Sequence, residues 1–173
     1  DLLALYSFTG GVAKYVELLM DKGATTRSKM IETIVQADSI FLSEGKNLLI
    51  EEFGKDYGIY FSILTAIASG HTQRSQIEDM IGKEIGGYLT MLEDSYGIIH
   101  KHKPLFTTKN SNIHYRLNDN FLTFWFRFLF KYNHMLEIEA FDALRQIIER
   151  DYETFSGKML EQYFKEKLAE QQQ

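Results

Sequence analysis

The sequence predicts a mainly α fold: a helical lid, then a winged helix-turn-helix with a two-stranded wing, then a C-terminal helical segment. Three observations predict it. The 173 residues contain one proline, Pro104, and helix interiors reject proline. Apolar residues make up 45% of the chain and recur at helical spacing along most of it. The period changes to two only on either side of Pro104, which indicates a single β-ribbon.

The first expected segment is residues 1–52. Gly10 and Gly11 precede a helical apolar stripe that runs from Val12 to Leu19. Gly23 then suits a helix C-cap, and Ser28 is the expected N-cap of the next helix. We expect short helices throughout this segment.

The second expected segment is residues 53–118. Three helical stretches end near Gly70, Gly82 and Gly97, and two alternating stretches follow, at 98–103 and 113–117. Three helices followed by a two-stranded ribbon is the order of a winged helix-turn-helix.

The third expected segment, residues 119–173, is helical throughout. Aromatic residues cover nearly the whole circumference of the stretch 121–130, so that helix is expected to be buried on most sides. Two further helices are expected, one over 138–155 and one over 159–168.

Composition excludes several classes of protein. The chain has no cysteine, so it has no disulfide, no thiolate metal site and no cysteine nucleophile. Its net charge of −5 argues against a chain that is basic all over. Its apolar stretches are shorter than the about 20 residues of a membrane helix, and no signal peptide is visible. We therefore expect a cytoplasmic protein without a membrane partner.

A search for catalytic motifs gives none. Each Gly-Lys pair lacks the Ser or Thr of a phosphate-binding loop, and neither a nucleophile elbow nor a His-Glu-x-x-His helix is present. We expect no catalytic residues, no metal and no cofactor in this stretch of chain by itself.

Positive charge gathers on the ribbon. Lys101, Lys103, Lys109 and Arg116 are the charged residues between 98 and 116. They could contact DNA phosphate without reading sequence. The helix over 83–94 is acidic, with Gly86, Gly87, Thr90 and Glu93 expected at its exposed positions, so base readout is not expected. The alternative is a packing domain with a basic, solvated wing.

The ribbon also carries His100, His102 and His114. On facing strands, three imidazoles could bind a metal ion. The alternative interpretation is exposed wing histidines.

Three runs of sequence resemble one family. Tyr6–Val16, with Gly10-Gly11-Val12, resembles the lid motif of prokaryotic AAA+/STAND-type ATPases, the archaeal-type ATPases, with Ala13 where proline is commonest. Tyr60–Gly70 is similar to the opening of that family's winged helix, and Tyr115–Phe126 to the entry to its final domain. Pro104 also stands where the family has a proline.

The resemblance implies that an ATPase core, binding ATP and magnesium, precedes Asp1 in a longer protein. It places Gly10, Gly11 and Lys14 against the nucleotide, with Lys14 as a phosphate contact. Residues 1–52 would be a lid remnant and 119–173 the opening of a restriction-endonuclease-like domain, in which Glu161 would be an acidic residue. The expected function is a regulatory adaptor that relays nucleotide state to an effector or protein partner. The alternative is a DNA-binding module, and association into oligomers is left open.

Overall fold

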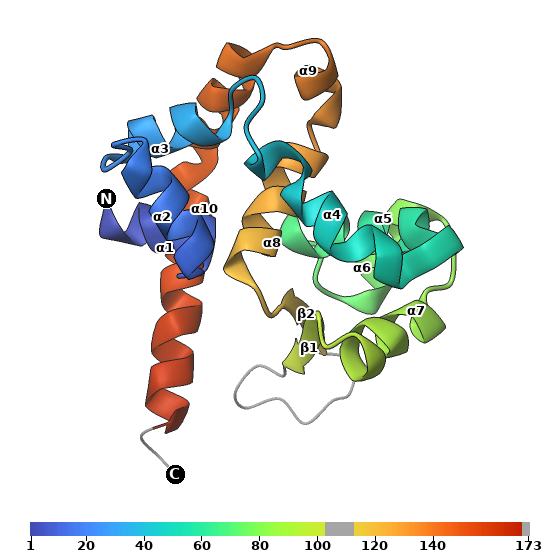
Figure 1. Cartoon of the computed structure of the whole chain (residues 1–173). Coiled ribbons are helices and arrows are strands. Elements are labelled where there is room, and N and C mark those ends of the chain that lie inside the picture. The colour runs from blue at the N-terminus through green and yellow to red at the C-terminus, as the bar shows by residue number, and fades with distance from the viewer. Residues whose placement is uncertain (103–112, 171–173) are drawn as a thin grey trace. The chain divides into compact units, whose positions relative to one another are not determined.

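The computed structural model describes residues 1–102 and 113–170 and confirms the mainly helical fold (Figure 1). Within these ranges the β-structure is one two-stranded antiparallel hairpin between helices. The expected wing residues Lys103, Pro104 and Lys109 lie outside the described residues. No helix in the described part of the chain is long and apolar enough to cross a membrane.

The chain forms two compact units, Asp1–Leu42 with Tyr132–Gln173 (unit 1) and Ser43–Lys131 (unit 2). These units do not follow the three expected segments, because pairs of helices far apart in sequence pack together. In unit 1, the last helix packs on the first and third helices, and in unit 2 the aromatic stretch 121–130 packs on the helix that opens the winged fold. The roles assigned to the three segments stay predictions.

Unit 1 is built on its C-terminal helix. Its helices are α1 (Leu2–Thr9), α2 (Ala13–Asp21), α3 (Arg27–Ile34), α9 (Asn133–Glu137) and α10 (Phe141–Glu170). The contact side of α10 is apolar, and its Leu144 and Ile148 are fully buried. Phe8 of α1 meets Tyr152 of α10 edge to face, with ring centroids 5.8 Å apart. Burial of this apolar surface holds the two ends of the chain together.

Two expectations for unit 1 are wrong. Thr26, not Ser28, is the N-cap of α3, and its hydroxyl accepts the Lys29 backbone N–H at 3.4 Å. The two helices expected over 138–155 and 159–168 are the single helix α10. No proline interrupts the stretch between them, and Gly157 is an exposed helical residue there, which weakens a helix without ending it.

Unit 2 contains the winged helix-turn-helix. After α4 (Phe41–Phe53) and the short turn η1 (Gly54–Asp56), its elements are α5 (Tyr57–Ala68), α6 (Arg74–Ile81), α7 (Gly86–Thr90), η2 (Met91–Ser95), β1 (Ile99–His102), β2 (His114–Leu117), α8 (Asn120–Phe124) and η4 (Trp125–Phe130). The π-helical segments η2 and η4 continue α7 and α8 directly.

The hairpin is fixed to the helices by its register and by one backbone bond. Ile99 pairs with Leu117, and both side chains are buried. The Tyr115 backbone N–H donates to the Thr72 carbonyl at 2.7 Å, which ties β2 to the turn between α5 and α6. The base of the wing is therefore a fixed part of unit 2.

The core of unit 2 is aromatic, and the expected burial of 121–130 is confirmed. The Phe61 ring meets three rings of the α8–η4 helix edge to face, with centroids 5.1–6.1 Å away, those of Trp125, Phe126 and Phe130. Gly45 of α4 faces this cluster, because a Cβ built there would lie 2.2 Å from a Trp125 ring carbon. Only a residue without a side chain fits at that contact.

Alanine at two helical glycines should therefore have opposite effects on stability. Gly45→Ala should lower the free energy of unfolding by about 1–3 kcal/mol, because Trp125 must move. Gly157→Ala should raise it by about 1 kcal/mol, because nothing lies within 4 Å of that Cβ and alanine favours the helix. Urea denaturation followed by circular dichroism measures both. Equal stability of the two variants would contradict the Trp125 contact.

Candidate functional site

The two cations of the wing that the structure describes point to opposite faces of the ribbon. Arg116 pairs with His100 across the strands, whereas Lys101 pairs with Tyr115 one position along. Because side chains alternate between the faces of a strand, Lys101 shares a face with buried Ile99 and Tyr115. Arg116 lies on the other face. The expected phosphate contacts Lys101 and Arg116 therefore do not form one basic patch.

The charge of Lys101 is balanced within the fold. Its ammonium forms an ion pair with the Glu93 carboxylate of η2, and its backbone N–H donates to Glu93 Oε1 at 3.2 Å. The hydrogen bond to Glu93 raises the pKa of Lys101. Glu93, expected at an exposed position, is instead half-buried by this contact. Sequence reasoning missed this pair because it joins a helix to a strand.

The three wing histidines do not assemble a metal site. His114 Nδ1 lies 2.7 Å from Thr72 Oγ1, and its Nε2 lies 3.3 Å from Gln73 Nε2, so both ring nitrogens have partners on the turn before α6. His100 Nδ1 bonds to Asn118 Oδ1. Within residues 1–102 and 113–170, no three His, Asp or Glu side chains are grouped so that they could hold a metal ion.

The start of α7 is supported by a polar contact that the sequence did not reveal. Glu78 of α6 accepts the Ile85 backbone N–H at 3.0 Å and pairs with Arg74 Nε at 2.7 Å. The Ile85 bond first, and then the bond from Arg74, lower the pKa of Glu78 below its usual value. The Arg74 guanidinium also covers Gly86, where a Cβ would lie 3.0 Å from it. Gly86 is therefore half-buried rather than exposed.

A shallow depression of about 600 Å³ opens beside α7. It is lined by Tyr60, Arg74, Gly86, Gly87, Tyr88 and Met91, with Glu84 as a further lining residue. Gly87 and Thr90 are exposed, as expected for this helix face, and the backbone at Gly87 is open. In a winged helix-turn-helix this helix is the one that enters a DNA groove. Here α7 begins with two glycines, Gly86 and Gly87, and tyrosine and methionine side chains line the depression beside them.

The three residues expected against a nucleotide lie at the turn between α1 and α2. Gly10 and Gly11 have φ of 64° and 78°, a left-handed conformation that glycine adopts without strain. The Gly10 N–H donates to the Tyr6 carbonyl at 2.9 Å, and the Gly11 N–H to Thr9 Oγ1 at 3.1 Å. These amides already have acceptors, so a phosphate could bind them only by replacing those bonds. Lys14 is exposed, in the first turn of α2.

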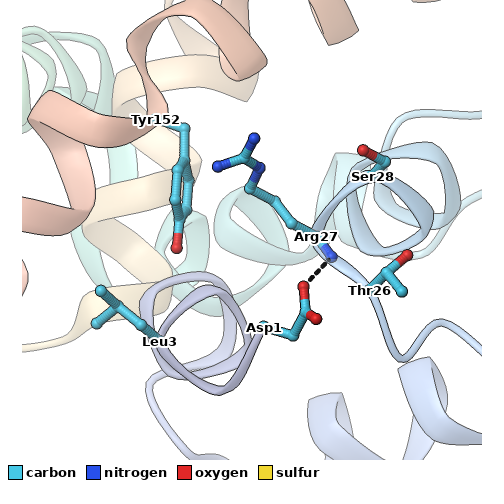
Figure 2. A pocket seen from close by; sticks show the side chains of 6 residues that line it. All are labelled: Asp1, Leu3, Thr26, Arg27, Ser28 and Tyr152. Carbon is cyan, nitrogen blue, oxygen red and sulfur yellow. Dashed lines mark hydrogen bonds between the residues drawn. The ribbon is translucent and has the colours of Figure 1, made fainter.

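A second depression, of about 360 Å³, lies in unit 1 around Arg27 (Figure 2). The Arg27 backbone N–H donates to Asp1 Oδ1 at 3.0 Å, and Figure 2 shows the guanidinium directed toward the Tyr152 ring, 4.6 Å from its centroid. The guanidinium also pairs with Glu149 at 3.0 Å and Glu153 at 2.8 Å. These contacts join α3 to α10, so we interpret this cluster as structural. Glu161, further along α10, is exposed.

Fold and site together define a mainly helical protein with a winged helix-turn-helix whose wing base is held by internal contacts. Comparison with protein-family models finds no match, and no solved structure matches the chain. The chain is 28% identical over 174 residues to the uncharacterized protein MJECL04 of Methanocaldococcus jannaschii. The alignment covers 98% of this chain and 38% of that relative, so the chain spans well under half of the relative's length.

The Glu78 contact predicts a dependence of stability on pH. The pKa of its carboxyl is lower in the folded chain than the ordinary 4.5, so its stabilising effect is complete above pH 4.5 and is lost as the pH falls below that value. Glu78→Gln should flatten this acid-side loss. Urea denaturation at pH 6 and pH 3 tests it, with Glu84→Gln as the control because Glu84 has no ion pair among the described residues. A loss of the same size in Glu78→Gln and the unmodified chain would contradict the assignment.

Proposed function

We propose that this chain is the C-terminal regulatory and adaptor region of a multidomain ATP-binding AAA+ (STAND-like) ATPase. It would relay nucleotide state through its winged helix to an effector domain or a protein partner. The proposal rests on one observation, which is that a positive charge of the wing forms an ion pair with another part of the fold. Lys101 of the wing is bound to Glu93, so this surface resembles a packing module more than a DNA reader.

The size of the relative supports placing the chain in a larger protein. The chain aligns with only 38% of the Methanocaldococcus relative, over 98% of its own length. In the proposed ATPase, ATP and magnesium would be held by a core outside this chain. This chain would contribute the turn at Gly10 and Gly11 and the ammonium of Lys14. We place the protein in the cytoplasm, and self-association would be compatible with this role.

Unit 1 offers a physical route for the relay. The α1–α2 turn follows directly from α1, and α1 packs on α10 through two aromatic contacts. The Phe8 and Tyr152 centroids are 5.8 Å apart, and those of Tyr6 and Tyr163 are 5.9 Å apart. A nucleotide that moved the turn would shift α1 as a rigid helix and would press on α10, because close-packed side chains transmit displacement.

The second candidate function is non-specific DNA binding through the wing. Arg116 favours it, because its side chain lies on the face opposite Lys101 and the stretch 98–116 has no acidic residue. Phosphate contacts of this kind depend steeply on salt. Among the described residues, however, Arg116 alone presents wing charge on that face.

DNA binding separates the two candidates. The proposal predicts no binding of the chain to a labelled 20-base-pair duplex at 50 mM salt, measured by fluorescence anisotropy. Glu93→Gln should create weak binding by releasing Lys101, and Glu84→Gln is the matched control. Binding by the unmodified chain that falls steeply toward 200 mM salt, and that Arg116→Ala removes, would overturn the adaptor proposal in favour of the second candidate.

ATP hydrolysis tests the nucleotide contact. In the longer protein, Lys14→Ala should lower the rate about tenfold, because a hydrogen bond from a charged group is worth about 1.5–3 kcal/mol and 1.36 kcal/mol is tenfold in rate. Lys22→Ala, at the end of the same helix, is the control. Unchanged hydrolysis in Lys14→Ala would remove that contact. Hydrolysis by the 173-residue chain alone would overturn the proposal itself.

A further inference from the structure

His114, at the start of β2, joins the wing to the turn between α5 and α6. Its half-buried ring lies with Nδ1 2.7 Å from Thr72 Oγ1 and Nε2 3.3 Å from Gln73 Nε2. The next residue, Tyr115, donates its backbone N–H to the Thr72 carbonyl at 2.7 Å. A side chain and a backbone group of β2 therefore hold the same turn.

Helix α6 fixes the orientation of the Gln73 amide. Gln73 is the N-cap of α6 and forms a capping box with Gln76, in which each side chain faces the backbone N–H of the other residue. The Gln73 N–H donates to Gln76 Oε1 at 3.2 Å. Because the Gln76 N–H needs an acceptor, the amide oxygen of Gln73 turns toward α6. Its NH₂ group is left to face His114.

These hydrogen bonds select one neutral form of the His114 ring. Nε2 accepts from the Gln73 NH₂ group, so the ring hydrogen lies on Nδ1, which donates to Thr72 Oγ1. A second proton binds at Nε2 and places one N–H donor against another, which breaks that hydrogen bond. Turning the Gln73 amide restores the bond only by removing the acceptor of the Gln76 N–H.

The neighbouring groups on this face of the ribbon also oppose a positive charge on His114. His102 lies directly across the strands, and the two ring centroids are 5.5 Å apart. Arg116 follows on the same face of β2, because side chains alternate along a strand, and it pairs with His100. The exposed His71 precedes Thr72 in the turn. These neighbours are cations or imidazoles, so each proton taken up here adds repulsion.

The carboxylates of the elements packed around the ribbon already have partners. Glu93 of η2 forms an ion pair with Lys101 on the opposite face of the ribbon. Glu78 of α6 is paired with Arg74. Asp119, which follows β2, is the N-cap of α8 and accepts the Leu122 N–H at 2.7 Å. An added charge on His114 therefore displaces an existing contact wherever it recruits one of these groups.

We propose that His114 is a pH-sensitive contact between the wing and the start of α6, closed when its ring is neutral and released when the ring is protonated. Histidine side chains take up a proton between about pH 5 and 8. Since the folded contacts require the neutral ring, their stabilising effect is present at pH 7.5 and decreases as the pH falls through this range. The inference goes beyond the adaptor function and does not depend on it.

The hydrogen positions on the His114 ring test the proposal without any substitution. Long-range ¹H–¹⁵N correlation spectra of the full 173-residue chain distinguish a ring nitrogen that bears a hydrogen from one that does not. At pH 7.5 we expect the hydrogen on Nδ1 and none on Nε2. A hydrogen on Nε2 at that pH would overturn the proposal, because Gln73 could not then donate to it.

Release of the contact is measured at two backbone amides. Between pH 7.5 and 5.5, hydrogen-exchange protection of the Tyr115 amide, corrected for the intrinsic effect of pH, should fall about threefold to tenfold, as expected when one hydrogen bond is lost. The Gln76 amide resonance should shift over the same pH range, because it belongs to the capping box. Constant protection of Tyr115 over this range would also overturn the proposal.

Two histidine variants supply a matched comparison. His114→Gln keeps a polar side chain but takes up no proton, so both pH responses should disappear. His71→Gln is the control, because His71 is exposed and directly precedes the same turn, and it should respond as the unmodified chain does. An unchanged response in His114→Gln, or its loss in His71→Gln, would contradict the assignment to His114.

Discussion

The arrangement of unit 2 depends on the burial of Phe61. Its ring meets Trp125, Phe126 and Phe130, so one side chain of α5 fixes the position of the helix that follows the wing. Aromatic contacts of this kind add directional attraction to the burial of area. The same cluster limits α4 to a glycine at residue 45, where the Trp125 ring lies against the backbone. The first helix of the winged helix-turn-helix, α5, therefore packs against a layer of aromatic side chains from η4.

That support fixes the base of the wing, and the fixed base explains the distribution of charge. Ile99 of β1 and Leu117 of β2 face each other, and both side chains are buried. The other side chains of each strand therefore alternate between this inner face and the opposite, outer face of the ribbon. Lys101 falls on the inner side and meets Glu93, whereas Arg116 falls on the outer side. The stretch 98–116 has basic residues and no acidic ones in the sequence, but its two described cations lie on opposite faces of the ribbon. Lys101 and Arg116 therefore do not form one continuous basic patch.

Much of the fold could be predicted because local signals were strong. A single proline, glycines at helix ends and a change of period to two located the helices and the hairpin. The extent of α10 could not be predicted, because the pattern weakens near Gly157 while packing on α1 continues to Tyr163. The contacts at the candidate sites were missed for another reason. Glu78 with Ile85, and Glu93 with Lys101, join different elements and leave no periodic trace in the sequence.

The sequence by itself determined the mainly helical class, the order of the winged helix-turn-helix and the burial of the aromatic stretch 121–130. These depend on residue type and spacing, which act over one or two helical turns. Only the tertiary structure decided that residues 1–42 and 132–173 form one unit, that Lys101 is paired, and that a depression opens beside Gly87. These features depend on which distant segments meet, and that choice follows from how their side chains fill space together.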